Sequence, residues 1–243
     1  MSHVLLLGGT AEARALSQLL DARTGLRLTC SLAGVTRTPE RYGGTLRTGG
    51  FGGAEGLASY LQDNDVQALI DATHPFAATM HANAAHAAHL THIPLLRLER
   101  PEWPVEPGWI DTPDLPRAIA ALPTGATAFL ATGRFSATEL PVRRDVRLIL
   151  RALEPPETRP EGVELILGPP ARDADTEAAL FRQHGTTHLV TKNSGGGRAK
   201  LDAAEALDLS VVMIRRPSPP EGVRTVADPH AALRWLDRLL GSA

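Results

Sequence analysis

Small and hydroxyl-bearing residues directly follow several short apolar runs, and they are the first candidates for chemistry. Val4–Leu7 is followed by Gly8-Gly9-Thr10, and Ala68–Asp71 is followed by Ala72-Thr73-His74-Pro75. Hydroxyl groups, free backbone N–H groups and the start of a helix suit the oxygens of phosphate or carboxylate groups. If each apolar run is a strand of a parallel sheet, these residues gather at the carboxyl edge, where such sheets bind ligands.

The second half of the chain shows the same arrangement twice. Ala128–Ala131 is followed by Thr132-Gly133-Arg134, and His188–Thr191 is followed by Lys192-Asn193-Ser194 and three glycines. The lysine precedes the glycines, so the second segment is not a Walker P-loop. It is either a mobile connection or a loop that closes over a bound anion, and its glycines suit both.

The Gly8-Gly9-Thr10 turn matches part of a dinucleotide-binding fingerprint, although Ala13 stands where a third glycine is usual. NAD-binding folds place an acidic residue roughly 20 residues further on, to hold the ribose hydroxyls. Residues 30–37 contain no Asp or Glu, and Ser31, Thr36 and Arg37 suit a 2′-phosphate instead. We therefore expect NADPH rather than NADH if a dinucleotide binds. The alternative is that the glycines merely start a helix and Arg37 is a solvated loop residue.

Histidines are frequent around the segment that follows Ala68–Asp71. His74 precedes a proline, which restricts its backbone. It is either a catalytic acid or, as we favour, a residue that positions a ligand through the backbone. His81, His86, His89 and His92 have no carboxylate at matching spacing, so we expect an exposed, alanine-rich helix face rather than a metal site.

The elements that must position these residues alternate between short apolar runs and longer segments of helical period. This alternation predicts an α/β fold with mainly parallel sheets. Five prolines between residues 101 and 116 predict a domain boundary near residue 100, with domains at 1–100 and 101–243. The expected strands are Val4–Leu7, Leu26–Ser31, Thr45–Arg47, Ala68–Asp71, Pro94–Leu98, Ala128–Ala131, Val146–Leu150, Val163–Leu167, His188–Thr191 and Val211–Ile214. The expected helices are Thr10–Ala22, Ala54–Gln62, Phe76–His89, Ala174–His184, Lys200–Leu207 and Pro229–Leu240.

Composition excludes several classes of protein. The 25 basic and 27 acidic residues give a net charge of −2, which argues against a nucleic-acid-binding protein. The single Cys30 excludes an internal disulfide and a cysteine-based zinc site. No run approaches the roughly 18 apolar residues of a membrane span, and the first apolar run is too short for a signal peptide, so we expect a cytoplasmic protein. Lys192 and Lys200 are the only lysines, so arginines are the main groups available for anions.

Two common catalytic motifs, the nucleophile elbow of hydrolases and the Tyr–Lys pair of short-chain dehydrogenases, are absent from the sequence. There is no Gly-x-Ser-x-Gly elbow, which argues against an α/β-hydrolase. Neither Tyr42 nor Tyr60 is followed by a lysine four residues later, so a reductase here must work without a Tyr–Lys proton relay.

Seven segments, in this order, resemble the precorrin-6A reductase family of cobalamin biosynthesis, which includes the cobalt-precorrin-6A reductases. One departure is that Arg37 follows Val35-Thr36, where the family more often has an arginine directly after Ala-Gly, so the side chain that meets the 2′-phosphate stays open. The segments are Leu5–Glu12, Ser31–Gly34, Gly49–Gly53, Asp71–Ala77, Arg97–Trp103, Thr132–Arg134 and Thr191–Gly196.

The resemblance implies two Rossmann-like domains with a ligand cleft between them, the N-terminal one binding NADPH. It also implies hydride transfer to a ring double bond of precorrin-6A or its cobalt form, without a metal held by the protein. Taken with the strand ends, it gives as cofactor-binding candidates Gly8, Gly9, Thr10, Ser31, Gly34, Thr36, Arg37, Thr73, His74, Pro75, Thr132, Gly133, Arg134, Thr191, Lys192, Asn193 and Ser194.

The implied substrate is a tetrapyrrole with many carboxylates, which arginines and lysines would bind. The candidates are Arg97, Arg100, Arg134, Arg198 and Lys200. Asp145 and His74 are the candidate proton donors, with water as a third possibility. We expect neither a nucleic acid nor a membrane as a partner. Neighbouring pathway enzymes are possible partners, for the transient transfer of intermediates. Two other functions stay open: a nucleotide-sugar or tetrapyrrole transferase without redox chemistry, and a non-catalytic NADP sensor.

Overall fold

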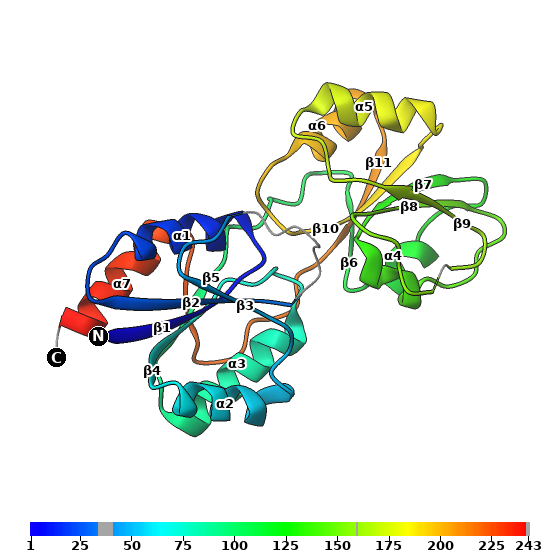
Figure 1. Ribbon diagram of the computed structural model, residues 1–243. Coiled ribbons are helices and arrows are strands. Elements are labelled where there is room, and N and C mark those ends of the chain that lie inside the picture. The colour runs from blue at the N-terminus through cyan, green and yellow to red at the C-terminus, as the bar shows by residue number, and fades with distance from the viewer. Residues whose placement is uncertain (34–40, 159, 242–243) are drawn as a thin grey trace. The chain divides into compact units, whose positions relative to one another are not determined.

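The structure is a computed structural model that describes residues 1–33, 41–158 and 160–241, without side-chain detail for residues 134–136 (Figure 1). It divides into two compact units. Unit 1 comprises Met1–Pro101 and Pro217–Ala243, and unit 2 comprises Glu102–Arg216. Each unit is a six-stranded parallel sheet with helices packed against it. The prediction of two α/β domains with parallel sheets is therefore confirmed.

The sheet of unit 1 has the strand order β12-β5-β4-β1-β2-β3. Strand β1 lies near its centre, and alternate side chains of this strand enter two different cores. Leu6 packs with helices α1 and α7, whereas Leu5 packs with α2 and α3. A strand buried on both faces must be apolar throughout, which explains the run Val4–Leu7. The strands are β1 (Ser2–Leu7), β2 (Leu26–Leu32), β3 (Thr45–Thr48), β4 (Val66–Asp71), β5 (Leu95–Leu98) and β12 (Arg224–Val226); the helices are α1 (Ala11–Asp21), α2 (Gly53–Asp63), α3 (Ala78–Thr91) and α7 (Pro229–Gly241).

The sheet of unit 2 has the strand order β6-β11-β10-β7-β8-β9. One of its faces is covered by helices α5 and α6, and there the rings of Phe129 and Phe181 meet edge to face at 5.0 Å. The strands are β6 (Ile110–Thr112), β7 (Thr127–Ala131), β8 (Arg147–Ala152), β9 (Val163–Leu167), β10 (His188–Lys192) and β11 (Ser210–Ile214); the helices are α4 (Leu115–Ala120), the 3₁₀ helix η1 (Arg134–Glu139), α5 (Ala174–Gln183) and α6 (Ala199–Ala206).

Every predicted strand and helix is present, with ends shifted by no more than two residues. Four short elements were not predicted: β6, α4, η1 and β12. Each has at most six residues, and β6 and α4 lie in the segment that prolines interrupt. Such short elements carry too few positions for a period to show.

The expectation that residues 101–243 form one domain is wrong for residues 217–243. Strand β12 pairs with β5 in the sheet of unit 1, with Thr225 opposite Arg97. Helix α7 then packs beside α1, and its Trp235 and Leu236 enter the core that α1 shares with β1. A proline-rich stretch indicates where a domain boundary lies, but no local pattern in the sequence indicates that a distant segment returns to an earlier sheet.

Candidate functional site

The carboxyl edge of the unit 1 sheet brings together three of the predicted segments. Leu7 at the end of β1 lies between Ser31 of β2 and Asp71 of β4. The Gly8 N–H donates to the Ser31 carbonyl at 2.9 Å, and the Ala72 N–H donates to the Leu7 carbonyl at 2.9 Å. The turn after β1 therefore lies directly beside the ends of β2 and β4, as the sequence predicts.

The two glycines of this turn are required for different reasons. A Cβ on Gly8 would lie 2.9 Å from Cδ2 of Leu32 and 3.0 Å from the Tyr42 ring, so Gly8 makes room for packing. Gly9 has φ of +131°, and no atom of the described residues outside its chain neighbours lies within 4 Å of the place where its Cβ would be. Its N–H donates to the Tyr42 hydroxyl at 3.0 Å. The space above Gly9 suits the close approach of a ligand to the backbone.

Thr10 serves as the N-cap of α1. Its hydroxyl accepts the Ala13 N–H at 3.1 Å and donates its own proton to the Ala72 carbonyl at 2.8 Å. The expectation that this hydroxyl donates to a phosphate is therefore wrong, because its proton already holds the turn after β4. The first backbone N–H groups of α1 have no acceptor within the helix and still favour an anion.

Arg47, at the end of β3, is a residue that the sequence analysis missed. Its guanidinium donates to Ser31 Oγ at 3.2 Å and to the carbonyls of Gly49 and Gly50 at 2.6 and 2.7 Å. It also lies 3.8 Å from the centroid of the Phe51 ring. Arg47 thus fixes the glycine-rich segment that leads into α2 and adds a positive charge beside Ser31. The predicted residues Gly34, Thr36 and Arg37 lie outside the described residues.

Thr73 is held by the carboxylate at the end of β4. Asp71 Oδ1 accepts the backbone N–H of Thr73 at 3.1 Å and its hydroxyl at 2.7 Å. Asp71 Oδ2 lies 2.6 Å from Nδ1 of His81. Burial raises the pKa of Asp71, but the hydrogen bonds from His81 and Thr73 outweigh it and leave this pKa below its ordinary value.

His81 is buried, so the expectation that it lies on an exposed helix face is wrong; only 4% of it is accessible. Its Nε2 lies 3.1 Å from Nη2 of Arg97. Arg97 is itself 3% exposed and forms an ion pair with Glu99 at 3.0 Å. Arg97 is therefore not placed to bind a substrate carboxylate, contrary to expectation. Ten residues of sequence separate His81 from Asp71, and no local spacing indicates that they meet.

His74 and Pro75 form the turn that leads toward α3. His74 is exposed, and its Nδ1 accepts the backbone N–H of Phe76 at 3.2 Å. Its carbonyl accepts the N–H of Ala77 at 2.8 Å. Pro75 is buried. These contacts fit the positioning role that we favour for His74.

The carboxyl edge of the unit 2 sheet brings together the other two predicted segments. Thr191 of β10 lies opposite Ala131 of β7, so Thr132 follows β7 where Lys192 ends the neighbouring strand β10. Gly133 has φ of +81° and open space where a Cβ would be. Burial lowers the pKa of Lys192, and the charge of Glu139 only partly opposes this shift. The side chain of Arg134 lies outside what the structure describes.

Asn193 has no group left for a ligand, contrary to expectation. Its Oδ1 accepts the N–H of Trp103 at 2.9 Å, and its Nδ2 donates to the carbonyl of Trp103 at 2.9 Å. Its own N–H donates to the carbonyl of Ile214 at 2.8 Å, and its carbonyl accepts Nε of Arg216 at 2.7 Å. Asn193 thus joins three segments of unit 2 and has a structural role.

Backbone groups of this loop also take part in hydrogen bonds. The Thr191 hydroxyl points to the carbonyl of Lys192 at 3.4 Å, and the Ser194 N–H donates to the same carbonyl at 2.7 Å. The Trp103 indole donates to the carbonyl of Gly196 at 2.9 Å. The carbonyls of Lys192 and Gly196 thus help to fix the loop.

Three of the expected substrate-binding residues already contact other groups. Arg100 pairs with Glu12 at 2.9 Å in unit 1. In unit 2, Arg198 pairs with Glu106 at 2.7 Å, and Lys200 lies 4.8 Å from the centroid of the Trp103 ring. A carboxylate that binds Arg100 or Arg198 must compete with these acidic partners.

Asp145 lies at the wrong edge of its sheet for the role of proton donor. It precedes β8, so it lies at the amino edge, whereas Thr132 and Lys192 lie at the carboxyl edge. Arg143 donates to both of its oxygens at 2.8 Å, and Thr124 donates at 3.0 Å. These hydrogen bonds, that of Arg143 first, hold the pKa of Asp145 far below its ordinary value. Asp145 is a structural carboxylate.

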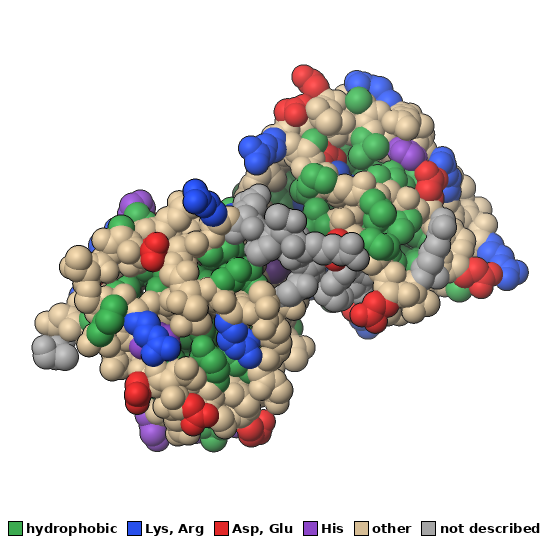
Figure 2. Space-filling view, viewed as in Figure 1, with side chains coloured by type: hydrophobic (Ala, Val, Ile, Leu, Met, Phe, Trp, Pro, Cys, Tyr) green, Lys and Arg blue, Asp and Glu red, His purple; other side chains and the backbone are tan. Residues whose placement is uncertain are grey.

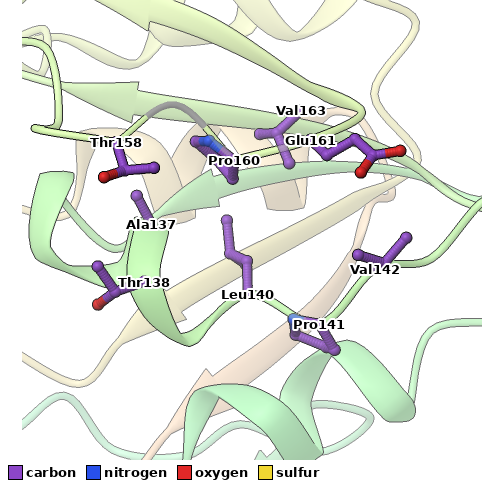
Figure 3. Close-up of a pocket in the computed structure, with 9 residues that line it drawn as sticks. All are labelled: Ala137, Thr138, Leu140, Pro141, Val142, Thr158, Pro160, Glu161 and Val163. Carbon is purple, nitrogen blue, oxygen red and sulfur yellow. The ribbon is translucent and has the colours of Figure 1, made fainter.

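Charged side chains and one cavity are further features of the surface. Acidic and basic side chains are interspersed over the visible face of each unit (Figure 2). A cavity of about 390 Å³ lies between the segment that ends η1 and the connection from β8 to β9, and Leu140, Thr158 and Glu161 are among its lining residues (Figure 3). It contains none of the predicted site residues. Within the described residues, we find no helix that combines the length and apolar character needed to cross a membrane.

Comparison with known proteins gives matches over nearly the whole chain. The model of the family described as precorrin-6x reductase CbiJ/CobK matches residues 3–237. A precorrin-6A reductase of Rhodococcus erythropolis is 45% identical over 98% of this chain and 99% of its own length. A cobalt-precorrin-6A reductase of Priestia megaterium is 31% identical over 88% of this chain and 90% of its own. The solved structure of a CobK precorrin-6A reductase has a TM-score of 0.87 and 37% identity, and the match covers 98% of this chain and 97% of that one.

Proposed function

We propose a specific reaction on the premise that this chain belongs to the precorrin-6x reductase (CbiJ/CobK) family, whose model matches residues 3–237. The chain is accordingly an oxidoreductase of cobalamin biosynthesis, and its reaction is the reduction of precorrin-6A, which the relative at 45% identity also performs by name. The whole-length match is the observation that carries this conclusion. It favours reduction over the transferase and sensor functions.

We propose NADPH as the reductant. Two features of unit 1 support it: the open space above Gly9 beside the start of α1, and the absence of any acidic residue from positions 30–37. Ser31 and Arg47 add a hydroxyl and a positive charge at the end of β2. When bound there, NADPH would supply the hydride that reduces a ring double bond, and a proton would complete the addition at the neighbouring carbon.

The residues of the chain have distinct tasks in this proposal. The first N–H groups of α1 bind the pyrophosphate, because they have no acceptor within the helix and lie at the positive end of its dipole, and the open backbone at Gly9 lets the pyrophosphate approach. Ser31, Thr36 and Arg37 bind the 2′-phosphate. Further candidates that contact the cofactor or the substrate from unit 2 are Thr132, Gly133, Arg134, Thr191, Lys192 and Ser194.

The substrate's carboxylates pair with cationic side chains, for which Arg100, Arg134, Arg198 and Lys200 are our proposals. His74 remains the candidate for proton transfer, since Asp145 lies at the opposite edge of its sheet. We also propose that the substrate is the metal-free macrocycle, because the precorrin-6A reductase is 45% identical and the cobalt-precorrin-6A reductase is 31% identical. A cytoplasmic location and transfer of the product to the next enzyme remain proposals from the sequence.

A comparison of cofactors tests this proposal. With precorrin-6A as substrate, we expect NADPH to be oxidised in equimolar amount. Its KM should be on the order of 10- to 100-fold below that of NADH, because NADH lacks the charged, hydrogen-bonded 2′-phosphate. Arg37→Ala should remove most of this difference. Arg27→Ala is the matched control, since Arg27 lies exposed at the other end of β2. Equal KM values for the two cofactors would refute the assignment of NADPH.

A further inference from the structure

Four polar side chains form a buried chain beneath the turn after β4. Asp71, His81, Arg97 and Glu99 lie in this order, with separations of 2.6 Å, 3.1 Å and 3.0 Å between the contacting atoms. Asp71, His81 and Arg97 are each less than 5% exposed. Water has little access to these three side chains, and within the described residues Nη1 of Arg97 has no hydrogen-bond partner. The positions of their protons then follow from the chemistry of each group.

The contact with Arg97 defines which ring nitrogen of His81 carries a proton. A guanidinium has only donors and keeps its charge, so Nη2 of Arg97 must donate to Nε2 of His81. Nε2 therefore carries no proton, and the proton of the neutral imidazole is on Nδ1. This Nδ1–H then donates to Oδ2 of Asp71. The two contacts thus define one tautomer of His81, in which Nδ1 donates to Asp71 and Nε2 accepts from Arg97.

The donor and acceptor of the next hydrogen bond, between Thr73 and Asp71, are also defined. The pKa of Asp71 is below its ordinary value, so at neutral pH the group is a carboxylate and can only accept hydrogen bonds. The hydroxyl proton of Thr73 must therefore point to Oδ1, at 2.7 Å. What Thr73 Oγ1 has left is a lone pair. Toward any ligand, this oxygen can only accept.

We propose that Thr73 binds a hydrogen-bond donor of the dinucleotide, either a ribose hydroxyl or the carboxamide N–H, and that it does not bind a phosphate oxygen. Two acceptor oxygens at hydrogen-bond distance repel each other. His81 is in this view a positioning residue that acts through Asp71. The inference rests on the proposed binding of NADPH and adds which part of the cofactor lies at this turn.

The same argument applies to Thr10 in the neighbouring turn. It separates the groups that bind phosphate from those that bind the ribose or the carboxamide. The Thr10 proton is donated to the Ala72 carbonyl, so neither threonine hydroxyl is available as a phosphate donor. Donors for the pyrophosphate are therefore backbone N–H groups, whereas acceptors for the ribose or the amide come from Thr73. The two threonines differ in that Thr10 is buried and Thr73 is partly exposed.

The first experiment measures the dissociation constants of NADP⁺ and inorganic pyrophosphate for the wild type and for two variants. Thr73→Val keeps the shape but removes the acceptor together with the hydroxyl that donates to Asp71, and Thr73→Ser is the matched control that keeps both. We expect Thr73→Val to weaken NADP⁺ binding about 3- to 10-fold, as expected for one neutral hydrogen bond, and to leave pyrophosphate binding unchanged. An equal loss for both probes would overturn the proposal.

Two further measurements make the result specific. In a crystal structure with NADP⁺, a hydroxyl or amide nitrogen should lie within hydrogen-bond distance of Thr73 Oγ1, and a phosphate oxygen there would overturn the proposal. His81→Leu should raise the KM for NADPH with little change in kcat, and His81→Asn, which restores a donor to Asp71, should recover it. If the wild type does not bind NADP⁺ at all, the proposed cofactor itself is wrong and this inference falls with it.

Discussion

Replacement of Asn193 by alanine tests whether this residue is structural, as its contacts indicate, or binds a ligand, as the sequence suggests. The side chain is 2% exposed and forms two hydrogen bonds of 2.9 Å with the backbone N–H and carbonyl of Trp103. Asn193→Ala leaves both backbone groups buried without these partners. Each such group costs about 1–3 kcal/mol, so we expect the free energy of unfolding to fall by about 2–6 kcal/mol.

Urea unfolding followed by circular dichroism and tryptophan fluorescence measures this loss. Asn193→Asp should lose a similar amount, because its second oxygen would face the carbonyl of Trp103. Asn83→Ala is the matched control: Asn83 lies partly exposed within α3, where alanine has the higher helix propensity, so its effect should stay within about 0.5 kcal/mol. A loss below about 1 kcal/mol for Asn193→Ala, together with a raised KM for NADPH, would refute the structural role and restore Asn193 as a ligand-binding residue.

Three other changes have defined outcomes in the same unfolding assay. A Cβ at Gly56 would lie 1.8 Å from the carbonyl oxygen of Phe51, so Gly56→Ala should cost at least about 2 kcal/mol, and unchanged stability would show that this turn relaxes freely. Glu177→Gln weakens the buried, doubly hydrogen-bonded pair with Arg151 and should cost about 3–5 kcal/mol, whereas Arg151→Met with Glu177→Leu should recover most of it; a double variant no better than Glu177→Gln would contradict this. The folded-state pKa of Asp71 is lowered, so its stabilising effect is complete above the unfolded pKa of about 3.9 and is lost as pH falls through the folded pKa. Asp71→Asn should therefore show a shallower loss of stability below about pH 4 than the wild type, and parallel curves would argue against the shift.

The sequence predicts those features that depend on neighbouring residues. The apolar run Val4–Leu7 predicts a central strand because both faces of such a strand are buried, and the residues that follow each strand lie at the carboxyl edge because parallel strands share it. Contacts between distant segments were not predicted. The pairing of β12 with β5 and the meeting of His81 with Asp71 depend on the folded sheet, and no spacing in the chain reports them.

Residue type alone also misjudged the roles of side chains at the predicted edge. Asp145 was chosen for its carboxyl group, but a residue that precedes a strand lies at the opposite edge from one that follows it. Arg97 was chosen for its charge, but the side chain is buried between His81 and Glu99. A sequence motif indicates which residues lie near a site. Whether a side chain points into that site depends on its neighbours in the fold.

The predicted polar residues share one property that bears on how the ligands are recognised. Thr10, Thr73 and Asn193 each donate hydrogen bonds to the protein itself, and Ser31 accepts one from Arg47. Their side chains shape the turns at the two sheet edges. In the function that we propose, contact with the ligands would fall largely to backbone N–H groups of these turns and to cationic side chains. Such a division would explain why glycines are frequent in these segments, because a Cβ would keep a ligand away from the backbone. It also predicts that substitutions of these threonines change cofactor affinity through the shape and polarity of a turn more than through the loss of a donor.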